Sequence, residues 1–73
     1  MITGFTYKGK NIIVADTGKW NGLNRIINVI DRTDGAWNHI GTTEVETING
    51  VHVLDWCFDA AWKLVQEKEA EAA

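Results

Sequence analysis

An amphipathic segment near the C-terminus is the feature that most constrains what this chain can fold into. From Cys57 to Val65 the apolar residues recur at helical spacing and fall on one arc of about 160°; they are Cys57, Phe58, Ala61, Trp62, Leu64 and Val65. Polar residues such as Asp59 and Lys63 lie opposite this arc. Asp55 is expected to be the N-cap, because a carboxylate there can accept a bond from an unpaired backbone N–H. We therefore predict one helix beginning near Asp55, with its apolar stripe packed on the rest of the chain.

The first half of the chain reads as strands joined by turns. Ile2–Tyr7 and Ile12–Ala15 are rich in β-branched and aromatic residues, and Lys8-Gly9-Lys10-Asn11 between them suits a hairpin loop. Asn21-Gly22 is a stronger signal for a type I′ turn, because both residues tolerate positive φ. A third strand is predicted over Arg25–Ile30. A helix over the same region is the alternative, since Trp20, Leu23, Ile27 and Ile30 also fit helical spacing.

The remaining strands are predicted from two further glycine turns. Asp34-Gly35 closes the third strand, and Ala36–Ile40 is expected to form a short strand carrying Trp37. Asn49-Gly50 repeats the hairpin signal between Thr43–Ile48 and Val51–Leu54, although a helix starting at Asn49 is an alternative. The predicted fold class is α+β: a small antiparallel β-meander of about four to six short strands packed against one C-terminal α-helix.

Length and composition indicate one small domain. The chain has 73 residues, with 45% hydrophobic and 23% charged residues, which is ordinary for a globular protein. We expect residues 1–68 to form a single compact domain and residues 69–73 a frayed acidic tail. Cys57 is the only cysteine, so no internal disulfide can form and no disulfide-linked partner is expected. Together with the lack of a membrane-spanning apolar stretch, this favours a complete chain in a bacterial or infected-cell cytosol.

No motif in the sequence demands catalysis, a metal or a cofactor. A cysteine nucleophile would require Cys57 with His52 or His39 as its base, but Cys57 lies on the apolar arc, where a buried thiol is a small hydrophobe. His52 alternates with two valines and is expected to point to solvent. Glu44 and Glu46 share a strand face that a solvated polar surface explains. We therefore predict no catalytic residues, no metal site and no cofactor, and an enzyme is the least favoured interpretation.

Charge is unevenly placed along the chain. Residues 1–32 hold five basic and two acidic residues, a net +3, whereas residues 33–73 hold two basic and eight acidic residues, a net −6. Basic and aromatic residues interleave in the first part, which is typical of surfaces that bind single-stranded nucleic acid; the candidates are Tyr7, Lys8, Lys10, Lys19 and Trp20. The overall charge of −3 weighs against this alternative, because phosphate neutralisation supplies most of the affinity for nucleic acid.

Protein binding is the favoured interpretation. Four tryptophans in so short a chain cannot all be core residues, and tryptophan and arginine are enriched at interface hot spots. Trp62 is predicted to be core, and Trp56 either folds onto the sheet or stays exposed. The candidate binding residues are Trp20, Arg25, Arg32, Trp37 and Trp56. The expected function is a non-catalytic regulator, of the kind bacteriophages encode, that binds and inhibits or modulates a larger host machine such as RNA polymerase or a defence nuclease.

Overall fold

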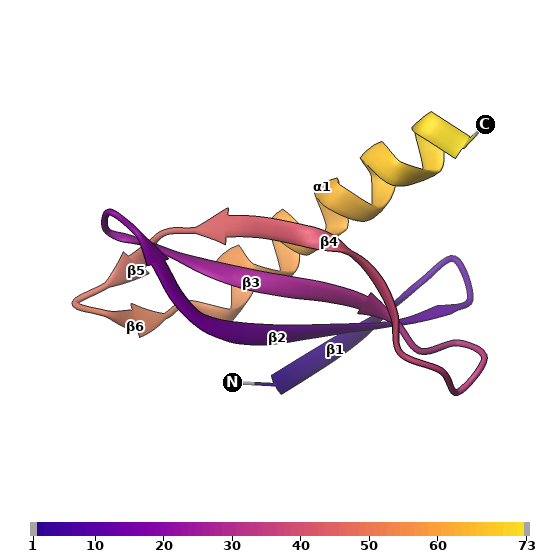
Figure 1. Cartoon of the computed structure of the whole chain (residues 1–73), viewed down its shortest axis with the longest axis horizontal. Coiled ribbons are helices and arrows are strands. Elements are labelled where there is room, and N and C mark those ends of the chain that lie inside the picture. Colours follow the sequence, from indigo (N-terminus) through magenta and orange to yellow (C-terminus); the bar gives the residue numbers. More distant parts are fainter. Residues whose placement is uncertain (1, 73) are drawn as a thin grey trace.

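Four consecutive antiparallel strands form a sheet in the order β1-β2-β3-β4, and one helix crosses a single face of it (Figure 1). The computed structural model describes residues 2–72. A short hairpin, β5-β6, links the last strand of the sheet to the helix. This confirms the α+β meander with a C-terminal helix. The elements are β1 (Ile2–Tyr7), β2 (Lys10–Asn21), β3 (Asn24–Asp31), β4 (Asn38–Val45), β5 (Thr47–Ile48), β6 (Val51–His52) and α1 (Leu54–Ala72).

Glycine turns set the register of the sheet. Lys8 and Gly9 both have positive φ, so β1 and β2 are joined by a two-residue turn, and the predicted four-residue loop is too long. Asn49 and Gly50 also both have positive φ, which confirms the predicted hairpin turn. The predicted Asn21-Gly22 turn is one residue out of register, because Asn21 pairs with Asn24. The turn residues are Gly22 and Leu23, with positive φ at Gly22 alone.

Strand β3 lies at the centre of the sheet, so the alternative helix over residues 20–30 is wrong. Two-residue alternation then places Ile27 and Val29 toward α1 and Ile26 and Ile30 on the open face. Strand β4 is continuous from Asn38, so the separate strand predicted over residues 36–40 does not form. Trp37 lies outside the strand.

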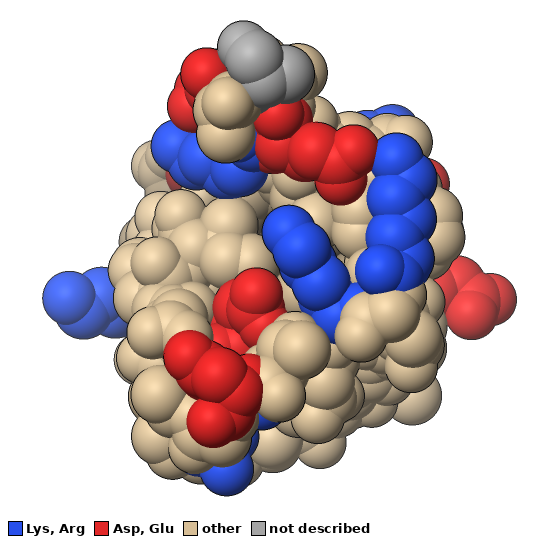
Figure 2. Space-filling view, turned by 90° about the vertical axis from the view of Figure 1, so that its right-hand side faces the viewer, with Lys and Arg blue, Asp and Glu red and all other residues tan. Residues whose placement is uncertain are grey.

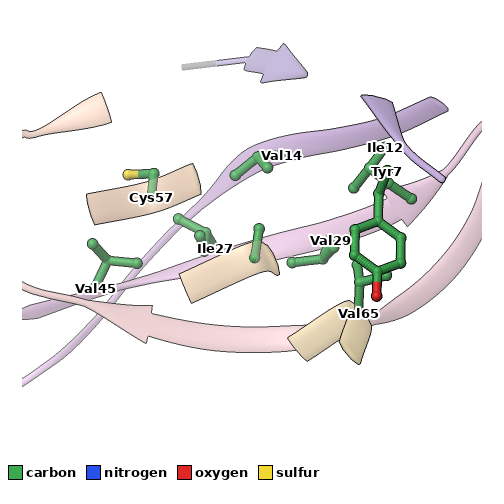
Figure 3. Packing of buried hydrophobic residues seen from close by; sticks show 9 residues of the cluster. Tyr7, Ile12, Val14, Ile27, Val29, Val45, Cys57 and Val65 are labelled. Atoms are coloured by element: carbon green, nitrogen blue, oxygen red, sulfur yellow. The ribbon is translucent and has the colours of Figure 1, made fainter. Parts of the chain in front are cut away.

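The core lies between the sheet and the first half of α1 (Figure 3). Alternate residues of each strand meet the helix stripe, so only one face of the sheet is covered. The buried residues are Tyr7, Ile12, Val14, Ile27, Val29, Val45, Cys57, Ala61 and Val65. The structure thus confirms the inward orientation of Cys57 in the predicted stripe.

Helix α1 begins before Asp55 and continues beyond residue 68, so both of its ends differ from the prediction. The backbone N–H groups of Trp56 and Cys57 donate to the carbonyl of Val53, so Leu54 opens the helix and Asp55 lies inside its first turn. Asp55 is therefore not the N-cap. Residues 69–72 continue the helix instead of fraying, and Glu69 pairs with Lys8 at 2.8 Å; Ala73 lies outside the described residues. Within residues 2–72, no helix is both long and apolar enough to cross a membrane.

Candidate functional site

All four tryptophans keep a large part of their surface in contact with solvent. Trp20, Trp37, Trp56 and Trp62 have exposed fractions of 46%, 63%, 42% and 42%. The prediction that Trp62 is a core residue is therefore wrong in part. Its ring contacts Phe5 and Tyr7, but β1 is the edge of the sheet, and none of residues 2–72 covers the indole beyond that edge. Trp56 is also exposed, which decides between the two alternatives for that residue.

Exposed apolar side chains gather at one end of the molecule. This end, called the hairpin end below, is formed by the β2-β3 turn, the β5-β6 hairpin and the start of α1, at the left of Figure 1. Of the nine large hydrophobic residues exposed within residues 2–72, six belong to it: Trp20, Leu23, Ile48, Val51, Leu54 and Trp56. Leu23 is 88% exposed, the largest fraction among them. Large apolar patches on a protein surface mark interaction sites.

The surface of the hairpin end contains two hollows. The first, of about 460 Å³, lies between the β2-β3 turn and the β5-β6 hairpin and is lined by Trp20, Leu23, Thr47, Asn49 and Gly50. The hydroxyl of Thr47 donates to the carbonyl of Leu23 at 3.4 Å, which holds the hairpin against the turn. The second, of about 280 Å³, lies beside Trp56 and is lined mostly by acidic and small residues: Glu44, Val45, Glu46, Asp59 and Ala60.

A half-buried ion pair positions Trp20. The Nε and Nη2 atoms of Arg25 donate to the two carboxylate oxygens of Asp16 at 2.8 and 2.9 Å. The guanidinium in turn lies 4.6 Å from the centre of the Trp20 ring, a cation–π contact. The bonds from Arg25, with a further one from the Gly18 N–H, lower the pKa of Asp16 to about 2. Arg25 is therefore a positioning residue for Trp20, and its charge is already compensated.

His52 faces the ion pair and not solvent, contrary to the prediction from its strand pattern. Its Nε2 lies 3.5 Å from a carboxylate oxygen of Asp16 and has no hydrogen-bond partner among the described residues. The hairpin β5-β6 folds toward the side of the sheet that α1 covers. The alternation of His52 with two valines therefore does not show which of these side chains faces solvent. His52 thus helps to close the hairpin over Asp16.

Cys57 lies next to this cluster but is fully buried. Burial, and more weakly the charge of Asp16, raises the pKa of its thiol. A thiol that is both covered and protonated is a poor nucleophile. Within residues 2–72, no three metal-ligating side chains lie close enough together to hold an ion.

The buried thiol predicts slow alkylation. In native buffer at neutral pH, iodoacetamide should modify Cys57 at least roughly tenfold more slowly than in urea, since reaction requires opening of the fold. Intact mass spectrometry over time measures both rates. Equal rates in the two conditions would mean that the thiol is accessible in the native protein, contrary to its burial between α1 and the sheet.

The predicted binding residues divide between the two ends of the molecule. Trp20, Arg25 and Trp56 belong to the hairpin end. Arg32 and Trp37 lie at the opposite end, where the guanidinium sits 4.1 Å from the centre of the indole ring. Sequence reasoning missed Leu23, Ile48, Val51 and Leu54. The available signal for three of them was a place in or beside a predicted Asn-Gly turn: Leu23 follows Asn21-Gly22, and Ile48 and Val51 flank Asn49-Gly50.

The residues predicted for nucleic-acid binding do not form a cationic surface with exposed rings. Tyr7 is only 2% exposed, so its ring cannot stack on a base. Lys8 pairs with Glu69, and Lys10 lines a hollow of about 420 Å³ together with Asp31, Lys68 and Glu69. Figure 2 shows basic and acidic side chains intermixed over this end. Lys8, Lys10 and Lys19 are exposed, but Trp20 is the one candidate among residues 2–72 whose aromatic ring is exposed as the nucleic-acid alternative requires.

No protein-family model matches the chain, and comparison with curated proteins and with solved structures found no match.

Proposed function

We propose that this protein is a non-catalytic regulator that binds a larger protein through the hairpin end. The observation that carries the proposal is the concentration of six exposed large apolar residues at that end of a 73-residue chain. Such residues lower solubility unless a partner covers them, and no element of the fold within residues 2–72 does so.

The hairpin end has the layout of a binding site with an aromatic anchor. Arg25 holds Trp20 beside the hollow of the β5-β6 hairpin, so the indole loses little conformational freedom on binding. Leu23 lines the same hollow, and Ile48 belongs to the hairpin that forms its other wall; both would help to exclude water from the contact. A rigid aromatic residue surrounded by apolar neighbours is typical of an interface hot spot.

The charges around Trp56 define the partner further. Glu44, Glu46 and Asp59 line the hollow beside this indole, so we expect a partner with an apolar centre and lysine or arginine at its rim. The basic N-terminal half is less suited to bind an acidic surface, because two of its cations, Lys8 and Arg25, are already paired. Opposite charge at the rim would orient the two proteins and raise the association rate.

The proposed mechanism is steric or allosteric occlusion of the partner. A domain of this size covers part of a large enzyme without needing chemistry of its own. A bacteriophage protein directed at host RNA polymerase or a defence nuclease is the class we propose.

Affinity capture with point variants tests the proposal. The wild-type protein, immobilised and exposed to bacterial lysate, should retain one large partner in stoichiometric amount. Leu23→Glu and Ile48→Glu should each weaken the purified complex by at least roughly tenfold, because a charge replaces an apolar contact. Both side chains are more than half exposed, so the fold should tolerate the changes.

Trp37→Glu is the matched control, because this indole is also exposed but lies at the opposite end of the molecule. It should bind the partner as tightly as the wild type, as measured by calorimetry. Capture of no stoichiometric partner, or equal binding by Leu23→Glu and Ile48→Glu, would count against the hairpin end as a binding surface.

A further inference from the structure

Strand β1 is an unprotected edge of the sheet. Its six residues, Ile-Thr-Gly-Phe-Thr-Tyr, include no charge and no proline, and its pairing with β2 is regular throughout. Proteins usually protect an exposed edge with charges, proline or a bulge. The other edge, β4, carries Glu44 and has a register shift in its pairing with β3, and α1 packs along it.

The rest of β2 shows how this sheet protects an edge. Beyond Ala15, β2 continues past the end of β1, and its pairing is irregular between Asp16 and Trp20. There the Gly18 N–H donates to the Asp16 carboxylate and the Lys19 N–H to the Thr17 hydroxyl. Side chains therefore satisfy two backbone donors in this irregular part of β2, whereas nothing equivalent occurs along β1 within residues 2–72.

The register identifies the backbone groups that point outward from β1. The Asn11 carbonyl accepts from the Arg32 N–H, so the backbone of Asn11 faces β3 and not β1. Asn11 is the partner of Thr6, and antiparallel pairs alternate between bonded and non-bonded. The N–H and C=O groups of Thr6, and by alternation those of Gly4 and Ile2, therefore point away from the sheet. They are the groups that a further strand would bind.

We infer that β1 pairs with β1 of a second copy of this chain, forming an antiparallel dimer centred on Gly4. A twofold axis at Gly4 sets Ile2 opposite Thr6 of the second copy, so each outward N–H meets an outward carbonyl. The strand is self-complementary in this register, and no like charges oppose each other, because it has none. The result is one continuous eight-stranded sheet, built from two four-stranded ones.

Side chains on both faces of β1 support the same pairing. Ile2 is 75% exposed on the open face. On the other face, Trp62 lies stacked on Phe5 with ring centres 5.7 Å apart and is 42% exposed. In the proposed register Phe5 lies opposite Thr3 of the second copy and diagonal to the second Phe5, within reach of aromatic contact. Dimerisation would therefore cover the indole that the monomer leaves open.

Sedimentation of the full chain tests the inference. The wild type should change with concentration from 8.2 kDa to twice that mass. Thr6→Pro removes the outward N–H without removing a bond to β2, and should raise the dimer Kd by roughly tenfold or more. Thr6→Val keeps the N–H and should dimerise like the wild type, so it is the matched control. Circular dichroism verifies that both variants are folded.

Amide hydrogen exchange of the wild type tests the β1–β1 pairing even if Thr6→Pro fails to fold. The amides of Ile2, Gly4 and Thr6 should be protected at concentrations where the dimer forms and exchange rapidly where the monomer prevails. A wild type of 8.2 kDa at every concentration overturns the inference. So does a dimer in which these three amides exchange rapidly, because it would then use another surface. Their protection by a different protein, with no dimer, also overturns it.

Discussion

Replacing Ile27 with alanine should lower the free energy of unfolding by about 2–5 kcal/mol, the usual range for a large buried aliphatic residue. Ile27 lies on the central strand β3, faces α1 and has no exposed surface. The loss of stability has two parts: the lost transfer free energy of the missing methyl and methylene groups, and the cost of the cavity that they leave behind. A domain of this length is typically stable by only roughly 4–11 kcal/mol, so the variant should be close to unfolding. Urea denaturation followed by circular dichroism measures the change.

Ile26→Ala is the control for that experiment, because it removes the same atoms from the adjacent residue on the opposite face. Ile26 is only partly covered and has no helix above it. Its replacement should cost less than half as much as that of Ile27, as expected for a residue that leaves no closed cavity. Equal losses for the two variants would contradict the one-sided core.

Much of the fold follows from local signals in the sequence. The hairpins at Lys8-Gly9 and Asn49-Gly50, and the inward stripe from Cys57 to Val65, depend on positive φ and on helical periodicity, both of which are properties of neighbouring residues. The errors concern the ends of elements, which local signals fix only to within a residue or two. Asn21 pairs with Asn24, which moves the turn by one residue. Leu54 rather than Asp55 opens the helix, because the Trp56 and Cys57 N–H groups bond to the carbonyl of Val53.

The candidate site was less predictable, because its contacts join residues that are far apart in the sequence. Trp20, Arg25 and Trp56 were identified from residue type alone, but the role of Arg25 depends on Asp16, nine residues away across the hairpin. His52 was assigned to solvent from its alternation, which fails in a two-residue strand that folds back on the sheet. Leu23 and Ile48 were missed because an apolar residue is first assigned to the core, and only their place at a turn indicates exposure.

Replacing Asp16 with asparagine should lower the free energy of unfolding at neutral pH by about 1–3 kcal/mol, because Arg25 is then left half-buried without a counter-charge. The same variant should change the response to acid. In the wild type, the pKa of Asp16 lies at about 2 in the folded state, below its ordinary value of 3.8. A lowered pKa means that the stabilisation is complete above about pH 4 and is lost as the pH falls toward 2, an effect of about 2 kcal/mol.

Urea titrations of wild type and Asp16→Asn at pH 7, 4 and 2 separate this contribution from the other carboxylates. The pKa values of Asp31, Asp34 and Glu69 are also lowered by their hydrogen bonds, so both proteins should lose stability in acid. The difference between them should be largest at pH 7 and shrink toward pH 2, where Asp16 is increasingly protonated in the wild type. Asp59→Asn, which removes an exposed partner of Lys63, should follow the wild type within about 0.5 kcal/mol throughout. A constant difference from pH 7 to pH 2 would show that the Asp16 carboxylate acts through its shape and hydrogen bonds, and that its charge does not hold Arg25 beneath Trp20.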